Sequence, residues 1–328
     1  MKISPLLKLT LIFTLCVIMM GAYTRLSDAG LGCPDWPGCY GMITVPDQHH
    51  ELTYAKAEFP EHTVEPEKAW LEMIHRYIAG SLGLLVLAIL FICLKTRHAP
   101  KKLPIAIVLL ILFQGALGMW TVTMKLMPVV VMSHLLGGFA LFSLLWLLFL
   151  RNSPNWLPGD EPLAKRLQSF ALLCLGVLVL QIILGGWTSS NYAALACTQL
   201  PICEGDWFNN LHPTDAFYPF HQTEGSYEFG ILGYSSRMTI HVAHRFGAIL
   251  TTLLLVWLTI RMLTLSQTVQ LKRSAWLLGF FLLVQISLGI SNVVFNLPLA
   301  IAVAHNAGAA LLLLTLVYIN YALWRQVK

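Results

Sequence analysis

Eight long apolar stretches constrain the fold of this chain more than any other feature. Each is long enough to cross the hydrocarbon core of a bilayer, about 30 Å thick, as a single helix. A helix satisfies its own backbone hydrogen bonds in lipid, which an open strand cannot do. The stretches lie near residues 9–26, 70–94, 104–124, 129–150, 167–188, 238–260, 274–295 and 298–321. We therefore predict an all-α integral membrane protein with eight transmembrane helices.

The composition agrees with a lipid environment. The chain is 57% hydrophobic and 11% charged, with a mean hydropathy of +0.69, and soluble domains of this size contain far more charge. Its net charge of +5 is what basic loops on one membrane face would produce. We therefore predict the bilayer as a partner and no nucleic acid.

The basic residues orient the predicted bundle. If the N-terminus is cytoplasmic, two thirds of the 21 Lys and Arg residues fall on the cytoplasmic side, as the positive-inside rule requires. They are Lys2, Lys8, Lys95, Arg97, Lys101, Lys102, Arg151, Lys165, Arg166, Arg261, Lys272, Arg273, Arg325 and Lys328. Both termini are then cytoplasmic, and the long loops near 27–68 and 188–237 lie outside. The first stretch could instead be a cleaved signal peptide, but the residues after it recur behind an internal stretch.

The second half of the chain repeats the first. Three matched blocks keep their internal spacing at offsets of 164 to 171 residues. The blocks are Gly21-Ala-Tyr-Thr…Cys33-x5-Cys39-x-Gly41 with Gly185-Gly-Trp-Thr…Cys197-x5-Cys203-x-Gly205, His75-Arg76 with His244-Arg245, and Gln114, Gly118, Val122 and His134 with Gln285, Gly289, Val293 and His305. We predict two pseudo-symmetric four-helix bundles, formed by residues 1–155 and 156–328.

Four cysteines lie in the loops that the topology places outside. An oxidising compartment lets disulfides persist, so the location predicts the pairs Cys33–Cys39 and Cys197–Cys203. A single zinc site built from all four is the alternative, although the usual C-x2–4-C spacing is missing.

Four histidines lie in the first turns of the even-numbered predicted helices, at one membrane depth: His75, His134, His244 and His305. A lone histidine in a span often bonds to a neighbouring helix, but four at equivalent repeat positions favour ligation. Each half can offer two imidazoles across its axis, as bundle cofactor sites do. Small and apolar neighbours favour haem iron over a bare ion, which would need more ligands nearby.

Charged neighbours of these histidines differ between the halves. Arg76 and Arg245 follow a histidine directly and could bind haem propionates or extend to the headgroups. Glu72 precedes His75 by three residues, whereas His241 occupies that place in the second half. Glu72 could serve as an acid or base at the first pocket or as a charge near the start of its helix.

Several strings together resemble the haem A synthase family, in its bacterial form with paired loop cysteines. They are Gly21-Ala-Tyr-Thr-Arg-Leu-Ser-Asp-Ala-Gly-Leu, Glu72-x-x-His75-Arg76, Ser133-His134, His244-Arg245 and Ala304-His305-Asn306. The resemblance covers almost the whole chain. It implies a multi-pass protein of the bacterial inner membrane that oxidises the C8 methyl group of haem O to a formyl group by successive hydroxylations. The product is the haem A of cytochrome oxidases.

The resemblance also implies roles for individual residues. His75 and His134 would bind haem O as substrate and haem A as product, with Glu72 near the reacting methyl group. His244 and His305 would hold a haem b that relays electrons from an unidentified donor. A partnership with haem O synthase is plausible because the substrate is apolar. The family string often begins Gly-Gly, where this chain has Gly21-Ala22.

Two other functions use the same histidines. A dihaem b-type electron carrier linked to quinol would hold two permanent haems in symmetrical surroundings. A haem-handling chaperone or exporter is a weaker alternative, since the short inner loops offer no docking domain. The asymmetry at Glu72 and the family resemblance favour the enzyme.

Overall fold

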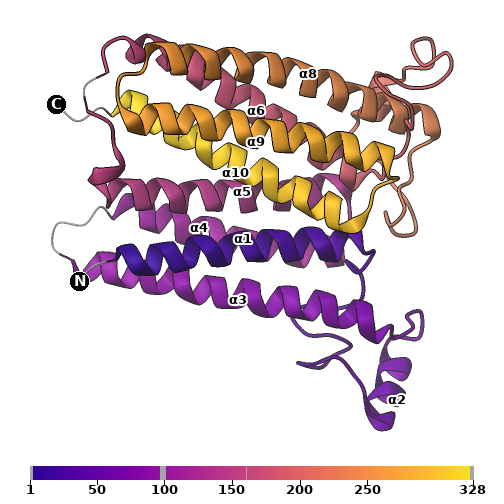
Figure 1. The fold of residues 1–328 in the computed structure, drawn as a ribbon. Coiled ribbons are helices and arrows are strands. Elements are labelled where there is room, and N and C mark those ends of the chain that lie inside the picture. Colours follow the sequence, from indigo (N-terminus) through magenta and orange to yellow (C-terminus); the bar gives the residue numbers. More distant parts are fainter. Residues whose placement is uncertain (1–2, 97–100, 160, 326–328) are drawn as a thin grey trace.

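The computed structural model describes residues 3–96, 101–159 and 161–325, which form helices joined by loops (Figure 1). These residues contain no β-strand, and a single isolated bridge pairs Cys39 with Met42. Within this part of the chain, eight helices are long and apolar enough to cross a membrane. They are α1 (Ser4–Leu26), α3 (Pro66–Lys95), α4 (Lys102–Thr123), α5 (Pro128–Arg151), α6 (Gln168–Ser190), α8 (Tyr234–Leu265), α9 (Val269–Val294) and α10 (Leu299–Trp324). The prediction of an all-α membrane protein is confirmed.

The ends of these helices follow local sequence signals. α1, α3 and α5 each carry proline in their first turn, where the missing N–H removes no hydrogen bond. α4 and α9 stop before two consecutive residues with left-handed backbone, Lys125 and Leu126 after α4 and Asn296 and Leu297 after α9. These two turns are 171 residues apart, so the repeat extends to the backbone conformation.

Four short helices were not predicted from the apolar pattern. α2 (His49–Glu58) and α7 (Pro213–Ala216) lie in the two long loops, and the 3-10 helices η1 (Pro154–Trp156) and η2 (Ala164–Leu167) lie between α5 and α6. α2 begins where Glu51 accepts hydrogen bonds from the N–H groups of Asp47 and Gln48, at 3.0 and 3.1 Å. These bonds hold the pKa of the Glu51 carboxyl below its usual value.

Helix contacts follow the same cyclic order in each half. α1, α3, α4 and α5 contact one another in a closed ring, and α6, α8, α9 and α10 do the same. α3 and α5 therefore stand diagonally, as do α8 and α10. The rings meet where α1 and α5 contact α10 and where α5 contacts α6. α1 begins and α10 ends at one end of the bundle, opposite the two long loops (Figure 1). Lys2, Arg97 and Lys328, used above for the topology, lie outside the described residues.

The main hydrophobic core occupies the part of the bundle far from the long loops. Leu145, Leu148, Leu255 and Leu258 are fully buried there, and every membrane-spanning helix contributes to this cluster. The four candidate histidines lie nearer the loops and are only half-buried. The tightest packing is therefore at one end of the bundle, and the four histidines lie toward the other.

Glu161 links the segment between α5 and α6 to the start of α9. Its fully buried carboxylate accepts hydrogen bonds from the N–H groups of Gln267 (2.9 Å) and Thr268 (2.5 Å), just before α9. Because bonds to a charged acceptor are strong and a buried donor left unpaired is costly, Glu161→Ala is expected to lower the free energy of unfolding by about 2 kcal/mol. Thermal unfolding in detergent measures this. Glu58→Ala, at an exposed carboxylate of α2, is the control and should unfold like the unsubstituted protein.

Candidate functional site

The four histidines form two pairs, each on diagonal helices of one ring. His75 lies on α3 and His134 on α5, and the two are close enough to interact electrostatically. His244 on α8 and His305 on α10 interact in the same way. The structure therefore brings together each pair that the repeat predicted, across the axis of its ring.

Each histidine lies against a glycine of the preceding membrane helix. A Cβ built on Gly21 would lie 2.9 Å from Cε1 of His75, and one on Gly185 would lie 3.2 Å from Cε1 of His244. The other two contacts are Gly118 with His134 at 3.5 Å and Gly289 with His305 at 3.2 Å. These glycines belong to the sequence repeat, and their missing side chains let the imidazoles approach a helix backbone closely.

The chemistry of the pockets fits haem. Nδ1 of His75, His134 and His305 is buried without a hydrogen-bond partner. Such a buried nitrogen is costly unless a ligand or a further hydrogen-bond partner occupies it. Each pair offers two imidazoles, which suffice for the axial positions of a haem. Among the described residues no group of three or more His, Cys, Asp or Glu side chains could hold a bare metal ion. The donor set therefore suits a tetrapyrrole that supplies the other ligands itself.

Glutamine amides reach the histidines of the second half, a contact that the sequence analysis missed. Nε2 of Gln181 lies 3.0 Å from Nδ1 of His244, and Nε2 of Gln285 lies 3.2 Å from Nε2 of His305. Both glutamines stand four residues before the glycine that contacts the histidine. The signal was present as a Gln-x3-Gly spacing, and only the structure shows that its amide touches the ring.

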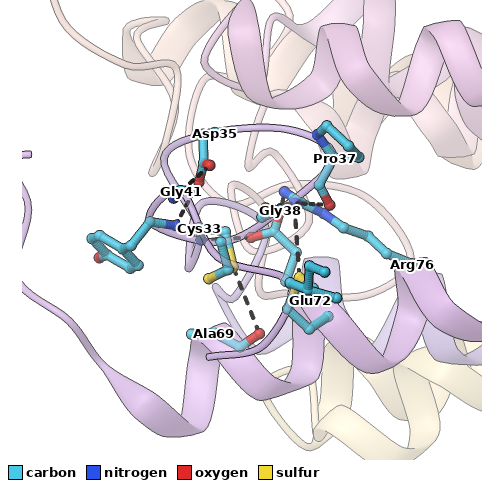
Figure 2. Close-up of a disulfide and its surroundings, with 12 residues drawn as sticks. Cys33, Asp35, Pro37, Gly38, Gly41, Ala69, Glu72 and Arg76 are labelled. Carbon is cyan, nitrogen blue, oxygen red and sulfur yellow. Dashed lines mark hydrogen bonds and ion pairs between the residues drawn. A yellow bond between two sulfur atoms is a disulfide. The ribbon is translucent and has the colours of Figure 1, made fainter. Parts of the chain in front are cut away.

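Glu72 and Arg76 connect α3 to the first long loop (Figure 2). The Glu72 carboxylate is 5% exposed and lies 2.5 Å from the Arg76 guanidinium. It also accepts a hydrogen bond of 2.9 Å from the backbone N–H of Cys33. Arg76 in turn donates to the backbone carbonyls of Pro37 and Gly38. The pair therefore holds the cysteine-bearing loop against the N-terminal end of α3.

Arg245 repeats this arrangement in the second half. Its guanidinium donates to the carbonyls of Cys197 (2.7 Å) and Gln199 (2.6 Å), and its Nε contacts Nε2 of His241 at 3.2 Å. His241 stands where the first half has Glu72, so no carboxylate of α8 takes part in holding this loop. Contact of Arg76 and Arg245 with haem propionates stays a prediction, since all these bonds lead to the loops or to helix neighbours.

The loop cysteines form two separate disulfides, Cys33–Cys39 and Cys197–Cys203, each with a Cα–Cα distance of 4.8 Å. The disulfide prediction is confirmed, and a zinc site shared by the four cysteines is wrong. In the first ring Asp35 accepts hydrogen bonds from the N–H groups of Tyr40 and Gly41, at 2.6 and 2.8 Å, and both of these residues have left-handed backbone. Figure 2 shows this ring above Glu72.

Gly21→Ala tests the contact between α1 and His75. The new methyl group would stand closer to Cε1 of His75 than real Cβ atoms do, so the imidazole must shift. We expect haem retention by the first pocket to fall by about tenfold, as when a ligand loses its orienting neighbours. The measurement is the amount and type of haem extracted from the purified protein. Gly80→Ala on α3 has nothing within 4 Å and should keep its haem; equal loss in both variants would contradict the contact.

Comparisons with known proteins agree over nearly the whole chain. The model of the COX15-CtaA family, described as cytochrome oxidase assembly protein, matches residues 5–317. The haem A synthase of Shewanella oneidensis is 66% identical over 326 residues, covering 99% of this chain and 98% of that protein. The haem A synthase of Nitrosospira multiformis is 28% identical over 336 residues, with 94% and 90% covered. That of Sinorhizobium fredii is 27% identical over 333 residues, with 95% and 87% covered.

Proposed function

From the premise that the chain belongs to the family of cytochrome oxidase assembly proteins and acts as a haem A synthase, an oxidoreductase of haem O, we propose that its two histidine pairs have different tasks. The first half, residues 1–155, binds haem O and releases haem A. The second half, residues 156–328, binds a resident haem b. The proposal rests on one observation above all: two histidine pairs, each on diagonal helices of a ring of four.

The reaction oxidises one methyl carbon of the substrate, at C8, through two hydroxylations followed by loss of water to the formyl group. His75 and His134 hold the substrate between α3 and α5, and orientation by two fixed helices is what the protein contributes to such chemistry. The resident haem b would supply electrons when bound. His244 and His305 hold it between α8 and α10.

Glu72, Arg76 and Arg245 act at the outer ends of the pockets. Arg76 and Arg245 hold the disulfide loops in place, which limits access of water to the pockets below. Glu72 stands one turn from His75 on α3, beside the first pocket only. We assign it the acid or base role in the oxidation, in addition to its bond with the Cys33 N–H. Arg76 and Arg245 are also the propionate-binding candidates nearest to the two histidines.

The proposed setting is the bacterial inner membrane, with both termini cytoplasmic and the disulfide loops on the outer side. The even number of spans and the excess of basic residues at one end support this orientation. Haem O synthase as a physical partner and a separate electron donor complete the proposal. Purification in mild detergent that never recovers haem O synthase would count against the partnership.

The identity of the bound haems tests the proposed function. The protein is expressed in membranes that make haem O, purified, and its extracted haems are identified by mass spectrometry. Haem b together with haem O, haem A or a hydroxylated intermediate is the expected result. Full occupancy by two haems b and no oxidised product would instead indicate a dihaem electron carrier.

A further inference from the structure

Three of the four histidines share a pair of neighbours that His75 lacks. At each of these three, a glutamine stands four residues before the glycine that contacts the histidine. A second glycine stands three residues after the histidine itself. These pairs are Gln114 with Gly137, Gln181 with Gly247, and Gln285 with Gly308. At His75 the corresponding positions hold Val17 and Ile78. Both positions are therefore different at one histidine.

The two positions depend on each other because they share one space. A Cβ built on Gly308 would lie 2.5 Å from Oε1 of Gln285, and the side chains of Gln114 and Gln181 lie in the same way against Gly137 and Gly247. An isoleucine side chain would fill this space and displace the amide. Val17 and Ile78 thus remove the glutamine and the room for it together.

In the second half the amide meets the imidazole directly. Gln181 and Gln285 lie within 3.2 Å of a ring nitrogen of His244 and His305, while Oε1 of both glutamines is buried without a partner. Rotating the Gln285 amide by 180° would bring that oxygen to the ring, where it can accept the N–H of an imidazole. The Gln181 amide also donates to the backbone carbonyl of His244 at 3.0 Å, so it contacts both the ring and the backbone of that histidine. Histidines that bind a metal normally donate their second ring N–H to such an acceptor, which fixes the tautomer and the ring plane.

In the first half one histidine has this support and the other lacks it, since Gln114 interacts with His134 as Gln285 does with His305. Gln114 is buried beside Gly137, and its Nε2 has no hydrogen-bond partner. His75 faces Gly21 and has the apolar Val17 and Ile78 where the others have an amide and its space. His134, His244 and His305 therefore each have a glutamine beside the ring, and His75 alone has none.

We propose that Gln181 and Gln285 are positioning residues that lock His244 and His305, and that His75, held by packing alone, is the ligand that can leave its haem. The inference rests on the assignment of haem O to the first half. A resident haem requires two fixed ligands. A substrate haem must enter and leave, and six-coordinate iron has no open position until one ligand moves away.

The first test measures how fast the second half loses its haem. Gln181→Met and Gln285→Met keep the side-chain length and remove the amide. Each is expected to speed transfer of haem b to a soluble haem acceptor about tenfold, the usual lower bound for losing a second-sphere bond. Gln168→Met is the matched control, because Gln168 on α6 bonds to the backbone carbonyl of Leu323 and to no histidine. Loss rates equal to the control would overturn the positioning role.

The second test exchanges the neighbours between the two halves and uses carbon monoxide as a probe for an open position on ferrous haem. In the dithionite-reduced protein carrying haem O, we expect carbon monoxide to bind the first-half haem. Val17→Gln with Ile78→Gly should slow this binding about tenfold, since an amide would then support His75. Gln181→Val with Gly247→Ile should make the haem b of the second half newly reactive.

The outcomes separate this inference from the proposed function. Binding of carbon monoxide to the second half of the unsubstituted protein would overturn the inference, as would unchanged rates in both exchange variants at full haem content. A protein that contains two haems b and makes no haem A would overturn the proposed function, whatever the glutamines do. If the variant Val17→Gln with Ile78→Gly does not fold, the variant Gln181→Val with Gly247→Ile still decides the test.

Discussion

His305→Ala is expected to remove the resident haem b and to leave unconverted haem O in the first half. The imidazole is one of two axial ligands offered between α8 and α10, and alanine offers no replacement. Retention of haem b should fall at least about 100-fold, the upper end of the losses seen when only an outer neighbour of a ligand is removed. Reduced-minus-oxidised spectra and mass spectrometry of the extracted haems measure the two halves separately.

His134→Ala is the matched variant, because His134 occupies the same place in the first ring. It should lose haem O and haem A and keep haem b. If His305→Ala instead lost haem O and kept haem b, the tasks of the two halves would have to be exchanged. If each variant lost both haems, the halves would not bind their haems independently.

Glu72→Ala is expected to lower the free energy of unfolding by about 3 to 5 kcal/mol, the range for breaking one partner of a buried ion pair. The loss arises because Arg76 would keep its charge in a largely buried place and the Cys33 N–H would lose its acceptor. Thermal unfolding in detergent measures this, and protease cleavage within residues 27–65 reports release of the loop. The double variant Glu72→Ala with Arg76→Met removes the unpaired charge and should recover most of the stability.

Glu72→Gln separates the two roles of Glu72, because it leaves Arg76, a propionate-binding candidate, in place. An acid or base role predicts that this variant accumulates haem O. Haem A made at the normal rate by this protein would restrict Glu72 to holding the loop. Glu72→Gln keeps the contact with the loop, since its amide oxygen can still accept the Cys33 N–H, while the negative charge is gone.

The membrane helices and the histidine pairs could be predicted because their signals are local or repeated. Apolar length alone located all eight spans, and the repeat singled out His75, His134, His244 and His305 among eleven histidines. The ring order of helices explains why each pair meets. Neither result required knowledge of side-chain contacts.

The anchoring of the loops could not be predicted, because it joins residues far apart in the chain. Arg76 meets Gly38 and Arg245 meets Gln199 through backbone carbonyls, which carry no sequence signal. The helix α2 was missed because it is polar and is capped by Glu51 rather than marked by hydropathy. The glutamines were visible in the repeat, but their amide contacts required the packing against the second glycine.

Under the proposed roles of the two halves, the contact between α5 and α10 bears on the direction of electron flow. These two helices carry His134 and His305 and form a common wall between the rings, whereas α3 and α8 lie on opposite flanks (Figure 1). Tunnelling weakens steeply with distance, so the shortest route between the proposed haems crosses that wall. The α3 flank, with the loosely held His75, is left for porphyrin exchange with the lipid. In this proposal reducing power and substrate reach the two pockets from different sides of the molecule.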